Sequence, residues 1–327
     1  MINNTTVKRV AILCSGGDCA GMNPAVKQFT EYATARGLEP YGINMGLAGL
    51  FRGDITPLGY HDVSGIVYRG GTILGSSRFP EFHDPEIRKV AAEQLRRHQI
   101  DSLVVLGGNG SFLALECLRR ECGVSVVGLP ATIDNDVYGS EMALGVDTSL
   151  NVIRHCLDSI RDTASSFHRA FVVETMGRDC GYLAIITALT SGAEVCLVPE
   201  VEFDITAIEN RLRGEIENGR TYLTAIVSEA VDGGAQMLTE VIESRLKMAC
   251  RTTVLGHVQR GGSPTVADRL NAFEMITIAV DELLAGRESF AVLSQSGRWV
   301  PVQLIDIVAR VISIPPNLLS MAHRLAN

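Results

Sequence analysis

Two glycine-rich segments carry the residue types that bind phosphate groups. Cys14–Asn23 and Leu106–Ser111 each follow an apolar run and open a helical pattern. Glycine lets backbone N–H groups approach a phosphate closely, and the first turn of a helix adds partial positive charge. The segments match neither the G-x-G-x-x-G nor the P-loop pattern, so each alone is compatible with a simple turn. Of the two, the second favours a phosphate site more strongly.

A third segment, Leu129–Asp136, brings carboxylates to another expected strand end. Thr132, Asp134 and Asp136 lie within five positions and could supply a polar contact, a general base and a metal anchor. Aspartate and asparagine in loops usually form turns, so either aspartate alone is weak evidence. The whole octet, following two glycine-rich segments, favours a functional site.

Seven cationic side chains lie beside glycines or expected strand ends. They are Arg69, Arg78, Arg169, Arg178, Arg251, His257 and Arg260. The planar donor fork of arginine matches phosphate geometry. A single exposed arginine is usually only solvated, but several in such positions favour anion binding.

Short apolar runs alternate with helical patterns along the chain, which predicts an α/β fold with mostly parallel sheets. The expected strands are 7–14, 38–44, 100–106 and 124–129, with helices at 23–36, 84–95, 111–120 and 146–160. Strand–helix pairs are expected at 170–191, 194–217, 221–249 and 252–286. Ligands of such sheets bind outside the carboxyl ends of the strands, so the two glycine-rich segments are expected to face one crevice.

Composition and charge exclude several classes of protein. The chain has 327 residues, which predicts about two domains, although no Pro- or Ser-rich linker separates them. Its net charge of -8 opposes nucleic-acid binding. No apolar run suggests a membrane span and no signal-peptide pattern opens the chain, so we expect a cytoplasmic protein. The eight cysteines lack C-x-x-C spacing and are expected to be buried, reduced thiols.

Six motifs together resemble the ATP-dependent 6-phosphofructokinases of bacterial type. They occur, in the family's order, at Ser15–Asp18, Arg69–Phe82, Gly107–Ser111, Thr132–Asp136, Val172–Arg178 and Val254–Pro264. The resemblance covers essentially the whole chain. It implies two interleaved three-layer α/β domains with mostly parallel sheets, an active site between them and a homotetramer. The expected large, ATP-binding domain is 1–144 plus 259–308, and the small, sugar-phosphate-binding domain is 145–258 plus 309–327.

The resemblance also assigns the nucleotide site. The residues that correspond to the family's ATP contacts are Gly16, Arg78, Phe79, Gly108, Asn109, Gly110 and Ser111. Gly110 leaves room for the α-phosphate of ATP, where relatives that use pyrophosphate carry an aspartate. Those relatives also carry a lysine where this chain has Ala131. Both residues favour ATP over pyrophosphate.

The same resemblance implies phosphorylation of fructose 6-phosphate at its 1-hydroxyl. Asp134 corresponds to the catalytic base, Arg178 to the cation on the transferring group and Thr132 to a positioning residue. The implied sugar-phosphate contacts are Thr132, Ile133, Asp134, Arg169, Met176, Gly177, Arg178, Glu229, Arg251, His257, Val258, Gln259 and Arg260. Arg169 and Arg251 would reach the 6-phosphate from a neighbouring subunit, so active sites would be shared between subunits.

One departure from the family pattern touches the implied magnesium site. The family has aspartate where this chain has Asn109, which with Asp136 would hold Mg²⁺. The loss of one negative charge predicts a working enzyme with weaker metal affinity. Alternatives are pyrophosphate as donor, another ketose phosphate such as sedoheptulose 7-phosphate as acceptor, or a catalytically weakened regulatory paralogue. A Rossmann oxidoreductase is opposed by the absence of G-x-G-x-x-G.

Overall fold

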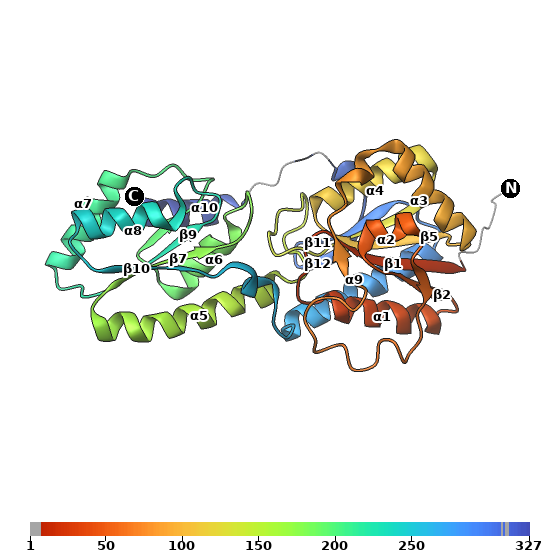
Figure 1. The fold of residues 1–327 in the computed structure, drawn as a ribbon, viewed down its shortest axis with the longest axis horizontal. Coiled ribbons are helices and arrows are strands. Elements are labelled where there is room, and N and C mark those ends of the chain that lie inside the picture. The colour runs from red at the N-terminus through yellow and green to blue at the C-terminus, as the bar shows by residue number, and fades with distance from the viewer. Residues whose placement is uncertain (1–7, 309, 311–313) are drawn as a thin grey trace. The chain divides into compact units, whose positions relative to one another are not determined.

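A computed structural model describes residues 8–308, 310 and 314–327 (Figure 1). Contacts divide the chain into two compact units, each built on its own sheet. Of the described residues, the first unit comprises 8–132, 136–148, 260–308 and 310, and the second comprises 133–135, 149–259 and 314–327. Within the described residues the chain passes between the units after residues 132, 135, 148 and 259. The sequence predicted crossings after 144, 258 and 308, and the last of these adjoins residue 309, which lies outside the described residues.

The first unit contains an eight-stranded, mostly parallel sheet. Its strands are β1 (Arg9–Ser15), β2 (Glu39–Ile43), β3 (Ile55–Pro57), β4 (Ser76–Ser77), β5 (Ser102–Gly107), β6 (Ser125–Pro130), β11 (Phe290–Gln295) and β12 (Arg298–Gln303). Their order is β12-β11-β6-β5-β1-β2-β3, and β4 pairs with β1. Only the β2–β3 and β11–β12 pairs of this sheet are antiparallel.

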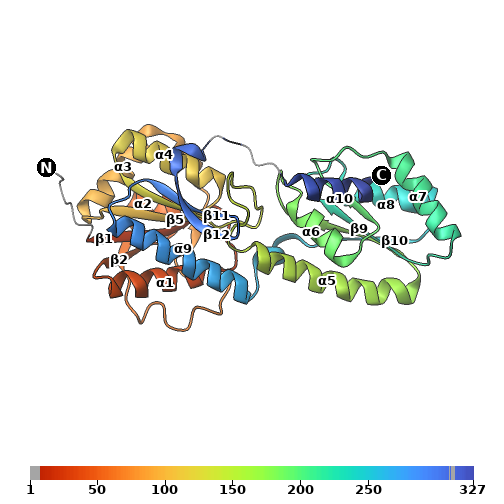
Figure 2. The same ribbon diagram turned by 180° about the vertical axis from the view of Figure 1, so that it is seen from behind.

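Helices cover both faces of this sheet. They are α1 (Met22–Ala35), α2 (Gly46–Arg52), α3 (Pro85–Arg97), α4 (Asn109–Cys122) and α9 (Val266–Leu284), with short 3₁₀ turns η1 (Pro80–His83) and η3 (Leu304–Asp306). Figures 1 and 2 show α1 and α9 on one face and α2, α3 and α4 on the other. Leu13, Leu103 and Val105 of the sheet are buried in one core with Phe112 and Leu115 of α4. Both faces are covered, which explains why the central strands read as continuous apolar runs.

The second unit contains a four-stranded, fully parallel sheet in the order β10-β7-β9-β8. The strands are β7 (Ala170–Thr175), β8 (Val195–Leu197), β9 (Leu223–Ser228) and β10 (Cys250–Val254). The remaining elements are α5 (Val146–Phe167), which begins in the first unit, and α6 (Tyr182–Ser191), α7 (Ile205–Glu217), α8 (Gly234–Arg245), η2 (Gly256–Arg260) and α10 (Pro316–Ala326). The predicted α/β class with mostly parallel sheets is confirmed.

The predicted start of α3 is confirmed. Asp84 caps α3, because its side chain accepts a hydrogen bond from the N–H of Glu86 at 2.8 Å, and Pro85 occupies the first turn. All eight cysteines are free thiols, but the predicted burial holds for only five of them, because Cys117, Cys122 and Cys156 are partly exposed. Burial raises the pKa of the Cys14 thiol to about 12, so this group beside the first glycine-rich segment is no nucleophile near neutral pH. No helix in the described ranges is long and apolar enough to cross a membrane.

The sequence reading missed the hairpin formed by β11 and β12. Its turn is Ser296–Gly297, and both residues have positive φ, 53° and 70°. A Ser-Gly pair between two apolar runs is a hairpin signal that was available in the sequence.

The start of α5 is held by a carboxylate from α9. Asp268 is fully buried and accepts hydrogen bonds from the N–H of Gly145 at 2.8 Å and of Thr148 at 2.8 Å. Its Oδ2 also accepts the hydroxyl of Thr148 at 2.5 Å. Burial raises the pKa of Asp268, whereas these hydrogen bonds act in the opposite direction. Three otherwise unsatisfied donors at a helix start are thus satisfied by one side chain.

We expect Asp268→Asn to destabilise the protein by about 1–3 kcal/mol, because an amide offers one acceptor oxygen to donors that now share two. Denaturant unfolding followed by circular dichroism measures this change. Asp158→Asn is the control. Asp158 and Arg154 form an exposed ion pair within α5, so this substitution should change stability little. Equal stability of the two variants would contradict the assigned role of Asp268.

Candidate functional site

The three segments singled out in the sequence leave neighbouring strands at one edge of the first unit's sheet. β1 pairs in parallel with β5, with Cys14 opposite Leu106, and β5 pairs in parallel with β6, with Gly107 opposite Pro130. Parallel strands end at the same edge, so the loops that follow β1, β5 and β6 begin side by side. The two glycine-rich segments therefore lie side by side, as a shared ligand crevice would require.

The loop after β1 is fixed by the short strand β4. Gly16 has φ +86°, a conformation that favours glycine, and its N–H donates to the carbonyl oxygen of Ser77 at 3.3 Å. The hydroxyl of Ser76 donates to the carbonyl oxygen of Gly16 at 2.8 Å. Arg78 follows β4 and is exposed. The predicted phosphate-binding residues Gly16 and Arg78 are therefore brought together by backbone pairing.

The loop after β5 leads directly into α4. Gly108 is extended and precedes Asn109, the first residue of the helix. The hydroxyl of Ser111 donates to the hydroxyl of Ser15 at 2.8 Å, and both side chains are buried. This bond ties the loop after β5 to the end of β1. The sequence placed Ser15 in a motif but did not indicate this contact, because its partner is 96 residues away.

Two positions in this second loop show why glycine is used there. A Cβ at Gly107 would lie 2.4 Å from the hydroxyl oxygen of Ser111 and 3.0 Å from the carbonyl oxygen of Ser15. A Cβ at Gly110 would have no atom within 4 Å. Gly107 is thus needed for close packing of the protein itself, whereas Gly110 faces open space.

The segment after Arg78 is held in place by aromatic contacts and by a buried arginine. The ring of Phe79 lies 5.8 Å from that of Phe51 and 6.4 Å from that of Phe82, measured between centroids. Arg88 donates to the carbonyl oxygen of Phe82 at 2.7 Å and forms two hydrogen bonds with Glu121 of α4, at 2.6 and 2.9 Å. Arg88 therefore joins this segment to α4, a role that the sequence did not indicate.

The third segment, Thr132–Asp136, is almost entirely buried. Asp134 is 8% exposed, and Asn135 has φ +51°. Contacts group Thr132 and Asp136 with the first unit but Ile133–Asn135 with the second. The motif thus contains a point where the chain passes between the units.

Asn109 makes a direct contact with the carboxylate predicted to hold metal. Its Nδ2 donates to Oδ2 of Asp136 at 2.9 Å and to the backbone carbonyl oxygen of Asp136 at 2.8 Å. The two predicted metal ligands are therefore adjacent. An aspartate at position 109 would place two carboxylates against each other instead.

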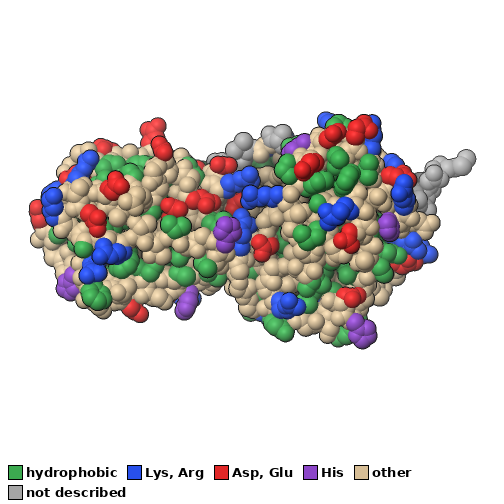
Figure 3. Space-filling view, viewed as in Figure 1, with side chains coloured by type: hydrophobic (Ala, Val, Ile, Leu, Met, Phe, Trp, Pro, Cys, Tyr) green, Lys and Arg blue, Asp and Glu red, His purple; other side chains and the backbone are tan. Residues whose placement is uncertain are grey.

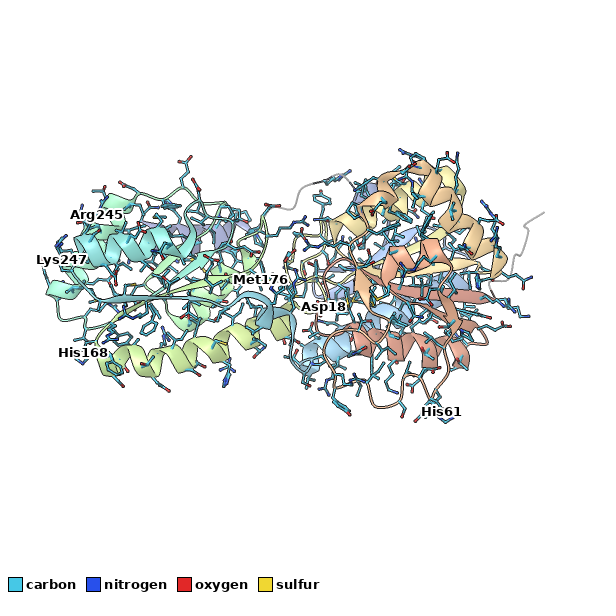
Figure 4. All side chains as sticks on the ribbon, in the orientation of Figure 1. Asp18, His61, His168, Met176, Arg245 and Lys247 are labelled. Atoms are coloured by element: carbon cyan, nitrogen blue, oxygen red, sulfur yellow. The ribbon has the colours of Figure 1, made fainter. Side chains whose placement is uncertain are left out.

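In the second unit, three predicted sugar-phosphate residues lie where β7 ends. Met176, labelled in Figure 4, is followed by Gly177 and Arg178, which have φ +141° and +56°. Oε1 of Glu229 accepts the N–H groups of Gly177 at 3.2 Å and Arg178 at 2.8 Å. Glu229 therefore holds the backbone that presents the exposed Arg178 side chain.

Gln259 supports the same edge of this sheet. Its side chain is 1% exposed, accepts the N–H of Met176 at 3.1 Å and donates to the carbonyl oxygen of Gly256 at 3.0 Å. His257 and Val258 precede it in η2 and are exposed. Arg260, grouped with the first unit, lies against Gly17.

Arg169 and Arg251 lie at the opposite edge of this sheet. Arg169 precedes β7, and Arg251 pairs with Phe171 near the start of that strand. β7 has six residues, so at about 3.3 Å per residue its two ends are roughly 20 Å apart. Figure 4 shows His168, next to Arg169, at one end of this unit and Met176 at the other. A single second unit therefore does not bring Arg169 and Arg251 to Arg178.

Charges on the visible surface are mixed. Figure 3 shows basic and acidic side chains interspersed over each unit. Within the described part of the chain, no three His, Cys, Asp or Glu side chains form a group suited to a metal ion.

Comparisons with known proteins identify relatives of similar sequence and fold. The family model described as Phosphofructokinase matches residues 9–283. The ATP-dependent 6-phosphofructokinase of Sulfurimonas denitrificans is 48% identical over 314 residues, which cover 96% of this chain and 98% of that protein.

Solved structures of similar fold extend this comparison. The crystal structure of Pichia pastoris phosphofructokinase in the T-state matches with a TM-score of 0.87 and 33% identity. The match covers 92% of this chain, which spans only 35% of that longer chain. A pyrophosphate-dependent phosphofructokinase from Nitrosospira multiformis shares the fold alone, with a TM-score of 0.84, 21% identity and coverage of 95% and 87%. From the match of the family model to most of its length and from its identity to the Sulfurimonas enzyme, the chain belongs to the phosphofructokinase family.

Proposed function

We propose that the protein is an ATP-dependent 6-phosphofructokinase. It transfers the terminal phosphoryl group of ATP to the 1-hydroxyl of fructose 6-phosphate and yields fructose 1,6-bisphosphate and ADP, a reaction of glycolysis. The observation that carries this proposal is the gathering of Gly16, Gly108 and Thr132 at one edge of a sheet, in a chain of this family.

ATP is the donor that the second loop accommodates. The side of Gly110 faces open space, which leaves room for a nucleotide phosphate. Ala131 is buried and brings no positive charge to the loop after β6. A pyrophosphate donor carries more charge close to the reacting phosphorus and would gain from a cation at this position. Both positions therefore support ATP.

In the proposed reaction, Asp134 accepts the proton of the sugar hydroxyl as that oxygen attacks phosphorus. Phosphoryl transfer depends on positioning and charge neutralisation more than on covalent participation by the protein. Arg178 supplies positive charge to the transferring group, and its backbone is held by Glu229 for this purpose. Thr132 positions the group from the loop after β6.

The donor set at Asn109 and Asp136 fits Mg²⁺. A carboxylate and an amide oxygen are the hard ligands that this cation prefers, and kinase sites often supply only one or two carboxylates beside the substrate phosphates. Mg²⁺, when bound, would neutralise charge on the nucleotide phosphates. Asn109 contributes no charge, and its amide N–H holds Asp136. We therefore expect weak affinity for the free cation.

We further propose a homotetramer with shared active sites. Arg169 and Arg251 lie at the sheet edge opposite Arg178 and Glu229, so they are available to the sugar phosphate of a neighbouring subunit. The ring of the exposed Phe167 lies under the guanidinium of Arg169 at 4.8 Å, which would orient this cation toward a partner. The proposed location is the cytoplasm, where ATP is plentiful. Neither another ketose phosphate nor a purely regulatory role is favoured.

Asp134→Asn tests the reaction and its base together. We expect the wild-type protein to form fructose 1,6-bisphosphate from ATP and fructose 6-phosphate with Mg²⁺ in a coupled assay. The variant should lose roughly 10²- to 10⁴-fold in kcat, while calorimetry still detects ADP binding. Asp232→Asn, at an exposed aspartate after β9, is the control. No product from the wild type would refute the proposed activity.

Asn109→Asp tests the magnesium site. Two carboxylates in contact repel each other unless a cation lies between them, so this variant should unfold at a lower temperature in EDTA than the wild type. Added Mg²⁺ should restore its thermal stability, and its activity should saturate at lower Mg²⁺.

The matched control for this prediction is Gln236→Glu. Gln236 of α8 in the second unit donates to the carboxylate of Glu240 at 3.1 Å, so the substitution creates a similar carboxylate pair outside the loops that follow β1, β5 and β6. Its activity should keep the wild-type dependence on Mg²⁺. An Asn109→Asp enzyme with an unchanged magnesium requirement would contradict the assigned role.

Mixed tetramers test the shared site. Arg178→Ala and Arg251→Ala should each abolish most activity alone. When the two variants are unfolded together and reassembled, about a quarter of sites should combine intact residues from both parents if subunits associate at random. Activity should then return toward that fraction. Mixtures as inactive as either parent would argue against sharing.

A further inference from the structure

The guanidinium of Arg260 lies directly on the backbone of the first glycine-rich loop. Its Nη1 donates to the carbonyl oxygen of Asp18 at 3.2 Å. A Cβ built at Gly17 would lie 2.0 Å from Nη1, 2.8 Å from Cζ and 3.1 Å from Nη2. The arginine therefore occupies the space that any other residue at position 17 would fill.

Space, and not backbone conformation, is what position 17 requires. Gly16 has φ +86°, where a side chain is strained, but Gly17 is absent from the residues with positive φ. The atoms that a Cβ would meet at Gly17 belong to the far end of one flexible side chain. An alanine there would displace the guanidinium and leave the loop backbone unstrained.

The backbone that follows Arg260 is also fixed, by the segment that precedes β4. A Cβ at Gly70 would lie 2.4 Å from the carbonyl oxygen of Gly262, so these two glycines allow a close backbone approach. The hydroxyl of Ser263 donates to the carbonyl oxygen of Tyr68 at 2.8 Å.

The side chain of Asn23 in turn holds the turn that contains Gly70. It donates to the carbonyl oxygens of Arg69 and Gly70 at 3.2 and 3.0 Å and accepts the N–H of Ile73 at 2.7 Å. With the backbone after Arg260 held in this way, the direction of the arginine side chain depends on its contact with Gly17 and Asp18.

We propose that Gly17 is a positioning residue that acts through Arg260. The missing side chain of Gly17 and the carbonyl of Asp18 form a seat that holds the guanidinium ready for the 6-phosphate of the sugar. An arginine side chain loses rotamer entropy on binding, so orientation before binding increases affinity. The single hydrogen bond to Asp18 uses one of five N–H donors and leaves others for a phosphate. This inference rests on the proposed function.

The test is a double-mutant cycle of Gly17→Ala and Arg260→Ala, read by calorimetric binding of fructose 6-phosphate and, separately, of ADP. Gly17→Ala should weaken sugar-phosphate binding roughly 2- to 10-fold and change ADP affinity by less. In the Arg260→Ala background, Gly17→Ala should have no further effect. Gly59→Ala is the control, since a Cβ there meets only one atom, at an ordinary 3.5 Å.

Three binding results would overturn the inference. The first is unchanged sugar-phosphate binding in Gly17→Ala. The second is the same loss of sugar-phosphate binding with and without Arg260. The third is an equal fall in ADP affinity, which would mean that position 17 acts on the loop itself. Thermal unfolding checks that each variant folds, and any defect of Gly17→Ala should disappear in the double variant. A double variant that still fails to fold would also contradict the seat. A wild type that binds ADP but no fructose 6-phosphate would instead refute the proposed function.

Discussion

The parallel pairing of β1 with β5 and of β5 with β6 is the constraint on which the nucleotide loops depend. It brings the loops after Ser15, Gly107 and Pro130 to one sheet edge although more than a hundred residues separate the first from the last. The hydrogen bond between the hydroxyls of Ser111 and Ser15 then joins the loop after β5 to the end of β1. Side chains therefore only adjust an arrangement that the backbone hydrogen bonds between strands already determine. Glycines add no side chain to the loops, so a phosphate could approach the backbone N–H groups.

In the second unit, the length of a parallel strand keeps predicted site residues apart instead of bringing them together. The length of β7 separates its two ends, so Arg169 and Arg251 do not reach the ligand proposed for Arg178 of the same chain. At this edge Arg251 lies 3.8 Å from Glu243, and Arg169 lies over the ring of Phe167 at 4.8 Å. Under the proposed function, assembly brings the sugar phosphate of a neighbouring subunit to these cations, which makes oligomerisation part of the chemistry.

The alternation of strands and helices could be predicted from the sequence, because central strands buried on both faces read as apolar runs such as Leu103–Leu106. The reasons why particular positions need glycine could not be predicted from the sequence. Gly70 is needed because of Gly262, and Gly17 because of Arg260, and no local pattern reveals partners nearly 200 or more residues away. Similarly, the sequence identified Glu229 and Gln259 as sugar contacts by resemblance, but only the structure indicates that both hold the backbone around Met176–Arg178.

Asn109 lacks the negative charge of an aspartate, but its amide group orients the carboxylate of Asp136. An aspartate would increase the attraction for a cation but would repel Asp136 whenever the cation is absent. The amide instead donates to Asp136 at 2.9 Å, so the remaining carboxylate is oriented before any ligand arrives. In a chain with net charge -8, fewer carboxylates beside the nucleotide loops also reduce repulsion of anionic substrates. The proposed enzyme would therefore depend more on the phosphates of ATP to bring Mg²⁺ into the site and less on binding the free cation first.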